Sequence, residues 1–282
     1  MCATLFRMDV VLLGTGTPLP DPDRAGPATL IRTGDRNLLV DCGRGVLMRL
    51  AGAGIRNPAF LEAVFITHLH SDHTCDFNEV LTMWWAAQPT DVPLRVIGPV
   101  GTRDWVDRTI AMMADDIRYR VAHHADLNWG PRCDVTEVGD GLGYDVDGLR
   151  VRAALEDHGP VKPALGYRFE IDGSSVVVAG DTVPCDGLDS LCRDADAYVQ
   201  TVLRPDLVRA IPLPRIQDIL DYHSSVQDAA ETAKRNGVGR LVLTHMLPFC
   251  PPGTEGEWVD EAHTHFDGDV VIGPDLTSLT VR

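Results

Sequence analysis

The stretch Phe65-Ile66-Thr67-His68-Leu69-His70-Ser71-Asp72-His73 decides how the rest of the chain is interpreted. It follows the apolar run 63–66, which is typical of a buried strand. Side chains at i and i+2 of an extended chain point the same way, so His68 and His70 can bind one ion. If a helix follows, Asp72 and His73 can turn toward a second ion. Imidazole and carboxylate ligands favour zinc, with iron and manganese as alternatives.

The composition describes an acidic protein of 282 residues. A single α/β domain commonly reaches this length. Lys and Arg number 25 and Asp and Glu number 41, so the formal net charge is -16. A field of this sign repels polyanions, which disfavours nucleic acid as a partner.

The cysteines and the apolar runs indicate a cytoplasmic protein. Seven cysteines are scattered along the chain without a Cys-x-x-Cys pair, a pattern that suits a reducing compartment. Charged residues interrupt the N-terminal segment 1–9 too early for a secretory signal. No apolar run approaches the roughly 20 residues that span a bilayer, so we expect no membrane contact.

The remaining pattern alternates strands with helices. A strand at 10–13 ends in a tight turn at 14–18, and a hairpin is expected over 28–41. Helices are expected near 46–50, 78–87, 102–114 and 225–236. The stretch 115–130 is predicted to be irregular, with His123-His124 in a surface loop. Two facing sheets with helices outside are therefore predicted, in one domain, 1–282, with related halves at roughly 1–140 and 141–282.

Candidate metal ligands recur where predicted strands end. This position is where catalytic groups converge in layered α/β folds. Seven ligands would be enough to coordinate two metal ions. They are His68, His70, Asp72, His73, His158, Asp181 and His245.

The sequence around these ligands resembles the metallo-β-lactamase superfamily, whose His-x-His-x-Asp-His signature corresponds to residues 68–73. Within that superfamily it resembles the ribonuclease Z-like branch. The similarity also covers 13–17, 41–43, 163–169, 180–182 and 243–245. The resemblance implies a four-layer αβ/βα sandwich. It also implies one metal ion on His68, His70 and His158, and a second on Asp72, His73 and His245. Asp181 would bridge the two ions.

The resemblance further implies a zinc-dependent hydrolase in which a metal-bridging hydroxide is the nucleophile. Asp72 would orient the hydroxide and accept its proton. His223, in the Tyr222-His223-Ser224-Ser225 stretch, matches an extra histidine that stabilises negative charge or protonates the leaving group. Two divalent ions are expected, zinc first, with Mn²⁺ or Fe²⁺ as alternatives. A homodimer is a further expectation from the resemblance.

One departure from the family shapes the expected substrate. Ribonuclease Z enzymes carry a long insertion between the Gly-Tyr-Arg strand and the Gly-Asp-Thr strand, which grips tRNA. Here 166–171 reaches 176–181 through a short turn. With the acidic charge, this favours a small-molecule ester as substrate, with a phosphodiester, sulfate ester or lactone bond. The alternative is a ribonuclease Z-type endonuclease acting on tRNA 3' ends. A mono-iron dioxygenase and a non-catalytic binding module are disfavoured, because both metal sites look complete. The apolar segment Leu203–Leu220 is either a flap over the site or a packed connection.

Overall fold

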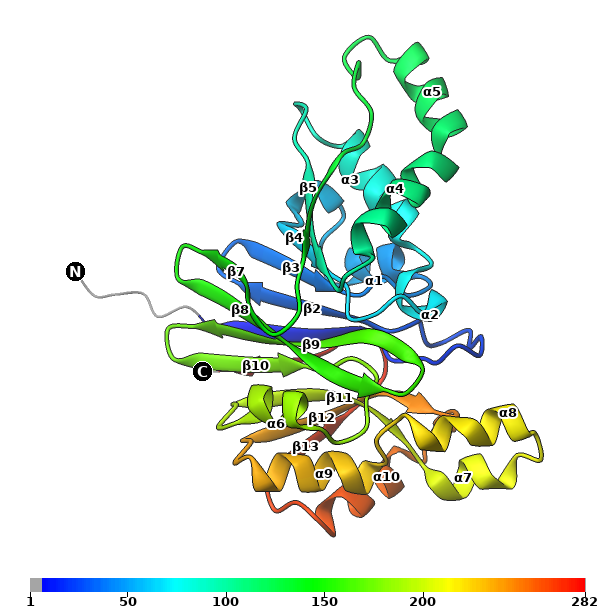
Figure 1. Ribbon diagram of the computed structural model, residues 1–282, viewed down its shortest axis with the longest axis vertical. Helices are drawn as coiled ribbons and strands as arrows, with labels where there is room; N and C mark the ends of the chain where they lie inside the picture. Colours follow the sequence, from blue (N-terminus) through cyan, green and yellow to red (C-terminus); the bar gives the residue numbers. More distant parts are fainter. Residues whose placement is uncertain (1–6, 282) are drawn as a thin grey trace.

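The computed structural model describes residues 7–281. Most of the segment considered for a secretory signal therefore lies outside the described residues. Two sheets face each other across the middle of the molecule (Figure 1). The chain passes from the first sheet to the second between residues 137 and 141. The predicted division into related halves near this point stays a prediction.

The first sheet has the strand order β14-β1-β2-β3-β4-β5-β6. Its strands are β1 (Met8–Gly14), β2 (Ala28–Thr33), β3 (Arg36–Val40), β4 (Ala63–Phe65), β5 (Leu94–Gly98), β6 (Cys133–Glu137) and β14 (Thr277–Val281). The pairs from β14 to β3 are antiparallel, and those from β3 to β6 are parallel. The predicted hairpin is β2 and β3, in which Thr33 pairs with Arg36.

The second sheet has the order β13-β12-β11-β10-β9-β8-β7. Its strands are β7 (Gly141–Val146), β8 (Leu149–His158), β9 (Val161–Ile171), β10 (Ser174–Val178), β11 (Ala197–Leu203), β12 (Arg240–Leu247) and β13 (Asp269–Ile272). The pairs from β7 to β10 are antiparallel and those from β10 to β13 are parallel. Ile171 pairs with Ser174 at the β9–β10 turn, so within the described chain no arm is inserted there.

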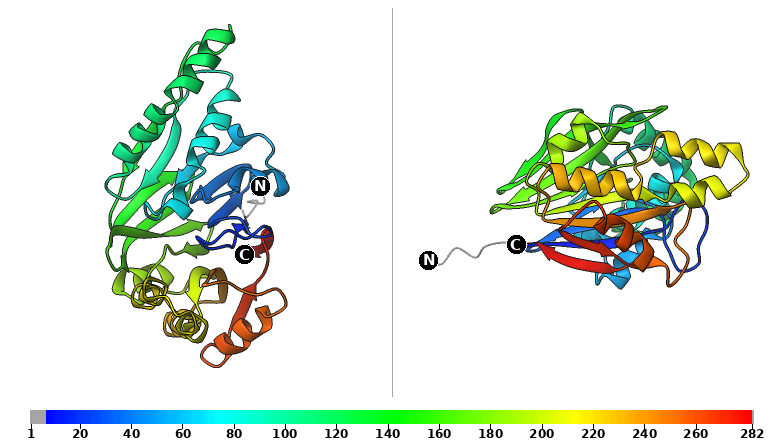
Figure 2. Two further views of the ribbon diagram at one scale, coloured as in Figure 1. Left: turned by 90° about the vertical axis from the view of Figure 1, so that its right-hand side faces the viewer. Right: turned by 90° about the horizontal axis from the view of Figure 1, so that it is seen from below.

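Helices cover the outer face of each sheet (Figures 1 and 2). On the first sheet lie α1 (Val46–Gly52), η1 (Pro58–Phe60), α2 (Ser71–Thr74), α3 (Phe77–Ala86), α4 (Thr102–Met112) and α5 (Ala114–His123). The helices associated with the second sheet are α6 (Asp186–Cys192), α7 (Pro205–Ala210), α8 (Pro214–Gln217), η2 (Asp218–Asp221), α9 (Val226–Arg235) and α10 (Glu255–His263). The predicted four-layer αβ/βα sandwich is confirmed.

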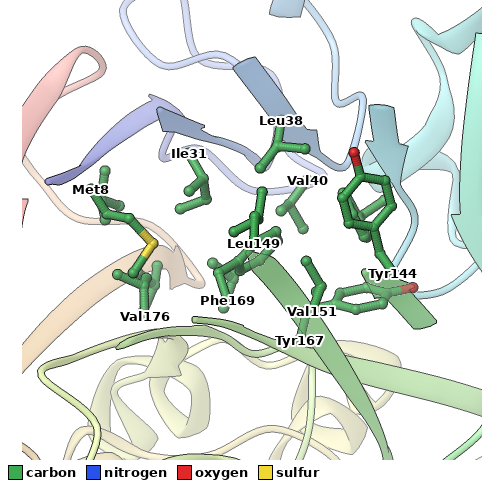
Figure 3. Packing of buried hydrophobic residues seen from close by; sticks show 14 of the residues in the cluster. Met8, Ile31, Leu38, Val40, Tyr144, Leu149, Val151, Tyr167, Phe169 and Val176 are labelled. Atoms are coloured by element: carbon green, nitrogen blue, oxygen red, sulfur yellow. The ribbon is translucent and has the colours of Figure 1, made fainter. Parts of the chain in front are cut away.

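The central core lies between the two sheets and is apolar because alternate side chains of both sheets point into it. Figure 3 shows this packing. Phe65, at the end of β4, is fully buried and meets three rings edge-on, those of Tyr144, Tyr167 and Phe169, at centroid distances of 5.2 to 5.9 Å. The strand that leads into the metal loop is therefore anchored in the densest part of the core.

Helix α3 packs into the core under the first sheet, whereas α5 departs from the pattern that the sequence predicted. Trp84 and Trp85 of α3 are 5% and 1% exposed, so they belong to the core. The prediction of an irregular stretch at 115–130 is wrong, because α5 occupies its first part and His123 is the last residue of that helix. The acidic first turn Asp115-Asp116 and the basic last turn complement the helix dipole, a signal that was available in the sequence.

Among the described residues, no helix combines the length and the apolar character that crossing a membrane requires.

Candidate metal centre

The metal loop begins where β4 ends and runs directly into the short helix α2. The hydroxyl of Thr74 donates to the carbonyl of His70 at 2.8 Å, and the amide of His73 donates to the same carbonyl at 3.2 Å. These bonds close one helical turn immediately after the extended residues. The turn brings Asp72 and His73 back toward the strand end.

The first group of candidate ligands contains His68, His70, His158 and Asp181. The Nε2 atom of His68 lies 3.1 Å from Nδ1 of His70, and Nε2 of His158 lies 3.3 Å from the same atom. Oδ2 of Asp181 lies 3.9 Å from Nε2 of both His68 and His158. The residues come from the end of β4, the end of β8 and the turn after β10. His70 is partly exposed, so the group is open to solvent on one side.

The second group contains Asp72, His73 and His245. Oδ2 of Asp72 lies 3.3 Å from Nε2 of His245 and 3.7 Å from Nε2 of His73. Oδ2 of Asp181 lies 3.4 Å from Nε2 of His73 and 3.6 Å from Nε2 of His245. One carboxylate oxygen thus approaches nitrogens of both groups. The structure brings together all seven residues that the sequence analysis selected.

The two groups differ in electrostatics. Burial lowers the pKa of His68 well below its usual value and lowers that of His158 to about 4. These rings are therefore neutral, as ligands must be. Burial also opposes the charged forms of His73 and His245, but the Asp181 carboxylate outweighs it. The pKa of His73 lies well above its usual value, and that of His245 is raised to about 9.

The residues of both groups fit divalent metal ions. Nε2 of His73, Oδ1 of Asp181 and both ring nitrogens of His245 are buried, and within the described part of the chain they make no hydrogen bond. Buried polar atoms without partners are costly, and protons on His73 and His245 offset that cost only in part. A cation between the rings and carboxylates would satisfy the Nε2 atoms of His73 and His245, which face the carboxylates of Asp72 and Asp181.

His223 lies beside the groups rather than within them. Its Nε2 is 3.2 Å from Oδ2 of Asp181, and its Nδ1 is 3.0 Å from the carbonyl oxygen of Ile219. The ring is 7% exposed. Ser225 follows as the N-cap of α9, and the predicted capping box with Asp228 is present. The cap fixes the start of α9 and therefore the position of His223, which lies two residues before the cap.

Sequence reasoning missed the residues that orient the candidate ligands. Asp41 is buried, and its Oδ2 accepts a hydrogen bond from Nδ1 of His73 at 2.8 Å. Oγ1 of Thr67 lies 3.0 Å from Nδ1 of His68, and Nδ1 of His158 lies 3.0 Å from the carbonyl oxygen of Tyr222. Such partners direct the other ring nitrogen toward a metal. Asp41 offered a signal, because it follows a predicted strand as the ligands do. It adopts φ 62°, a left-handed conformation that is uncommon outside glycine.

The remaining sequence features fall outside the two groups of candidate ligands. Besides His223, four histidines fall outside both groups, namely His123, His124, His263 and His265. Within the segment Leu203–Leu220, Val208 is buried against Leu203 and Leu247, and Ile216, Ile219 and Leu220 are partly buried around them, whereas Leu213 is exposed. Both interpretations of the segment, a flap over the site and a packed connection, stay predictions.

The fold and the site define a metal-dependent hydrolase of the metallo-β-lactamase fold. A family model described as the β-lactamase superfamily domain matches residues 36–246. Ribonuclease Z of Mycobacterium bovis strain BCG is 52% identical over 279 residues, covering 98% of this chain and 99% of the relative. Ribonuclease Z of Mycobacterium tuberculosis strain H37Rv is 51% identical over 278 residues and 98% of each chain. The chain belongs to the ribonuclease Z family of the β-lactamase superfamily.

Solved structures show the same fold. The metallo-β-lactamase fold protein YhfI from Bacillus subtilis superposes with a TM-score of 0.72 at 21% identity, covering 98% of this chain and 99% of that one. The short form of human tRNase Z superposes with a TM-score of 0.70 at 24% identity, covering 96% and 98%.

Two expectations are overturned by these relatives. The prediction of a small-molecule ester substrate is wrong, and so is the prediction that nucleic acid is an unlikely partner, because full-length relatives at this identity are named ribonuclease Z. The short β9–β10 turn gave no ground for exclusion, since the relatives align over 98–99% of their own length with a chain that has no room for a long arm. The net charge misled because it is summed over the whole surface, whereas a polyanion meets only the part that it touches.

Proposed function

We propose that the protein is a ribonuclease Z-type endonuclease that cleaves precursor tRNA at its 3' end. The full-length 52% identity to a ribonuclease Z carries this proposal. The seven candidate ligands, gathered at one edge of the sandwich, support it chemically. His70 is partly exposed, which leaves an approach for a phosphodiester much larger than the site.

The proposed metal ions are two Zn²⁺. His68, His70 and His158 would hold one, Asp72, His73 and His245 the other, and Asp181 would serve both. Imidazole and carboxylate donors without thiolates suit zinc, and they leave Mn²⁺ or Fe²⁺ as outcomes for metal analysis. When bound, such ions supply a water of lowered pKa and positive charge for the phosphoryl oxygens.

Asp72 is the proposed proton acceptor. Burial raises the pKa of its carboxyl, but the His245 ring, whose Nε2 lies 3.3 Å from Oδ2, and the charge of His73 outweigh burial and hold the pKa well below the usual range. The carboxylate is therefore ionised at neutral pH. It can orient the attacking water and accept its proton.

His223 is the proposed proton donor to the leaving oxygen. Its Nδ1 faces the carbonyl of Ile219, so that nitrogen carries a proton and the ring is held in one orientation. Nε2 faces Oδ2 of Asp181 at 3.2 Å, at the edge of the candidate metal centre. A proton carried on this nitrogen would be in position for transfer to the leaving oxygen, and a positive ring would also stabilise a developing oxyanion.

A cleavage assay on precursor tRNA with a 3' trailer tests the proposal. We expect the metal-loaded protein to release the trailer and Asp72→Ala to lose at least about 100-fold in rate. Glu79→Ala, which removes an exposed carboxylate from the nearby α3, should retain full rate. Intact precursor tRNA after incubation with wild-type protein at two metal ions per chain would refute the proposal. So would a fully active Asp72→Ala variant.

We also propose a cytoplasmic location. The six cysteines in the described part of the chain are free thiols, as expected in a reducing compartment.

A further inference from the structure

Helices α4 and α5 form a projection on the first sheet. In Figure 1 and in the left view of Figure 2, α5 extends beyond the ends of the strands, and its C-terminal end is the outermost part of the molecule. This ten-residue helix buries no residue. Only Ile117 and Val121 pack, partly buried, against the core beneath. Most of α5 is therefore surface with no partner within the described chain.

The outer end of α5 reverses the charge of the molecule. Residues 117–124, which we call the α5 tip, read Ile-Arg-Tyr-Arg-Val-Ala-His-His and contain no acidic residue. The whole chain carries a formal net charge of -16. Most of the surface therefore repels RNA, whereas the tip presents two guanidinium groups and two imidazoles. A projection of this composition, although flanked by Asp115, Asp116 and Asp126, repels a phosphate backbone less than the average of this acidic surface does.

The side chains of the tip suit RNA. Cζ of Arg118 lies 4.5 Å from the ring centroid of Tyr119, whose side chain is 59% exposed. A guanidinium stacked on an aromatic ring offers both a phosphate contact and a planar face for a base. Arg118 and Arg120 pair with Asp115 and Asp116, one turn nearer the body. Exposed pairs of this kind are weak, so phosphates can replace the carboxylates.

The projection begins beside the metal loop. Helix α4 begins after Gly101, where a β carbon would lie 3.8 Å from Cδ1 of Leu69, the residue between His68 and His70. The amides of Gly101 and Arg103 both donate to Oε1 of Glu137, and these bonds connect the start of α4 to the end of β6. The projection that carries the tip therefore begins beside the metal loop.

We propose that the α5 tip is an RNA-binding element that contacts the phosphate backbone of the substrate and supplies a grip that the short β9–β10 turn does not provide. The inference rests on the proposed function. It assigns binding, not chemistry, to Arg118, Tyr119 and Arg120. Losing the tip should therefore raise KM and leave kcat nearly unchanged.

The test compares two charge-matched double variants of the full-length, metal-loaded protein. Arg118→Ser/Arg120→Ser removes two charges from the tip. Arg150→Ser/Arg152→Ser removes two charges from exposed positions of β8. KM and kcat for precursor tRNA are measured from about 50 to 200 mM salt, and hydrolysis of bis(p-nitrophenyl) phosphate reports an intact site. Arg118→Lys/Arg120→Lys preserves the charge and serves as a rescue.

We expect the tip variant to raise KM about tenfold and to flatten the slope of log KM against log salt by about 1.4–1.8, since each phosphate contact contributes about 0.7–0.9. The lysine variant should restore the slope, and the β8 control should change KM less than about twofold. Equal effects of the two serine variants would overturn the inference, because total charge alone would explain them. A wild-type KM in the tip variant would overturn it as well. If wild-type protein hydrolyses bis(p-nitrophenyl) phosphate but leaves precursor tRNA intact, the proposed function fails first, and the inference with it.

Discussion

Replacing Asp41 by asparagine tests whether a residue outside the ligand set controls metal binding. Oδ1 of Asp41 accepts from the amide of Thr67 at 2.9 Å. Oδ2 accepts from the Thr67 hydroxyl and from Nδ1 of His73, both at 2.8 Å. In Asp41→Asn, Oδ1 can keep the amide bond while an NH₂ group faces His73. The NH₂ group and the Nδ1–H group of His73 are then two donors that face each other without an acceptor between them.

The neutral His73 ring, the form that binds metal, can relieve this conflict by moving its proton from Nδ1 to Nε2. Nε2 is the nitrogen that faces Asp72 and Asp181, so the new tautomer blocks the ligand position. Loss of such an orienting carboxylate typically weakens metal binding about 10- to 100-fold, or about 1.4–2.8 kcal/mol. A charge-assisted hydrogen bond is worth about 1.5–3 kcal/mol, which gives the same range.

The assay is competition for Zn²⁺ between the protein and a chromogenic chelator, with urea unfolding of the metal-free protein alongside. Asp275→Asn is the control. That carboxylate is equally buried and accepts from Thr15, Ala25 and Arg49, but from no candidate ligand. We expect the control to lose stability while its zinc affinity stays within about twofold of wild type. Wild-type affinity in Asp41→Asn, or an equal loss in Asp275→Asn, would refute the reasoning.

Three further changes separate chemistry, packing and charge. His223→Ala should lower kcat on precursor tRNA about 10²- to 10⁴-fold with unchanged metal content, and lost metal would show that the ring is a ligand. Phe65→Ala should cost about 3–5 kcal/mol in urea unfolding, because it empties a site among three rings; a cost below about 1 kcal/mol would contradict that packing. Hydrogen bonds from Arg36 lower the pKa of Glu62, so they stabilise the fold above the unfolded carboxyl pKa of about 4.3 and are lost as pH falls through the lowered folded value. The Tm difference between wild type and Glu62→Gln should therefore shrink below about pH 4, and a difference independent of pH would disprove the ionic origin.

Local patterns in the sequence accounted for much of the fold and for the composition of the candidate site. The apolar run before His68 predicted β4, and the capping box at Ser225 predicted the start of α9. Each candidate ligand was recognisable because it lies at or just beyond the end of a predicted strand. The pattern failed at α5, whose exposed, highly charged sequence lacks the apolar stripe from which helices are recognised.

Some of the site had no local signal. Asp41 and His73 are 32 positions apart, and their hydrogen bond exists only because β3 and β4 pair in parallel, with Val40 opposite Phe65. The contact between His158 and Tyr222 likewise joins segments that are 64 residues apart. The register between two strands depends on how whole layers pack, so it cannot be predicted from a short sequence motif.

By itself the sequence determined the family resemblance, the layered α/β architecture and the types of ligand, because these depend on residue type and spacing over short distances. Only the tertiary structure decided which side chains face one another, that Asp181 approaches both ligand groups, and where the positive charge of an acidic chain is presented. The reason is physical. Composition sums charge over the whole molecule and periodicity reports one element at a time, whereas binding depends on the few side chains that folding brings to one place.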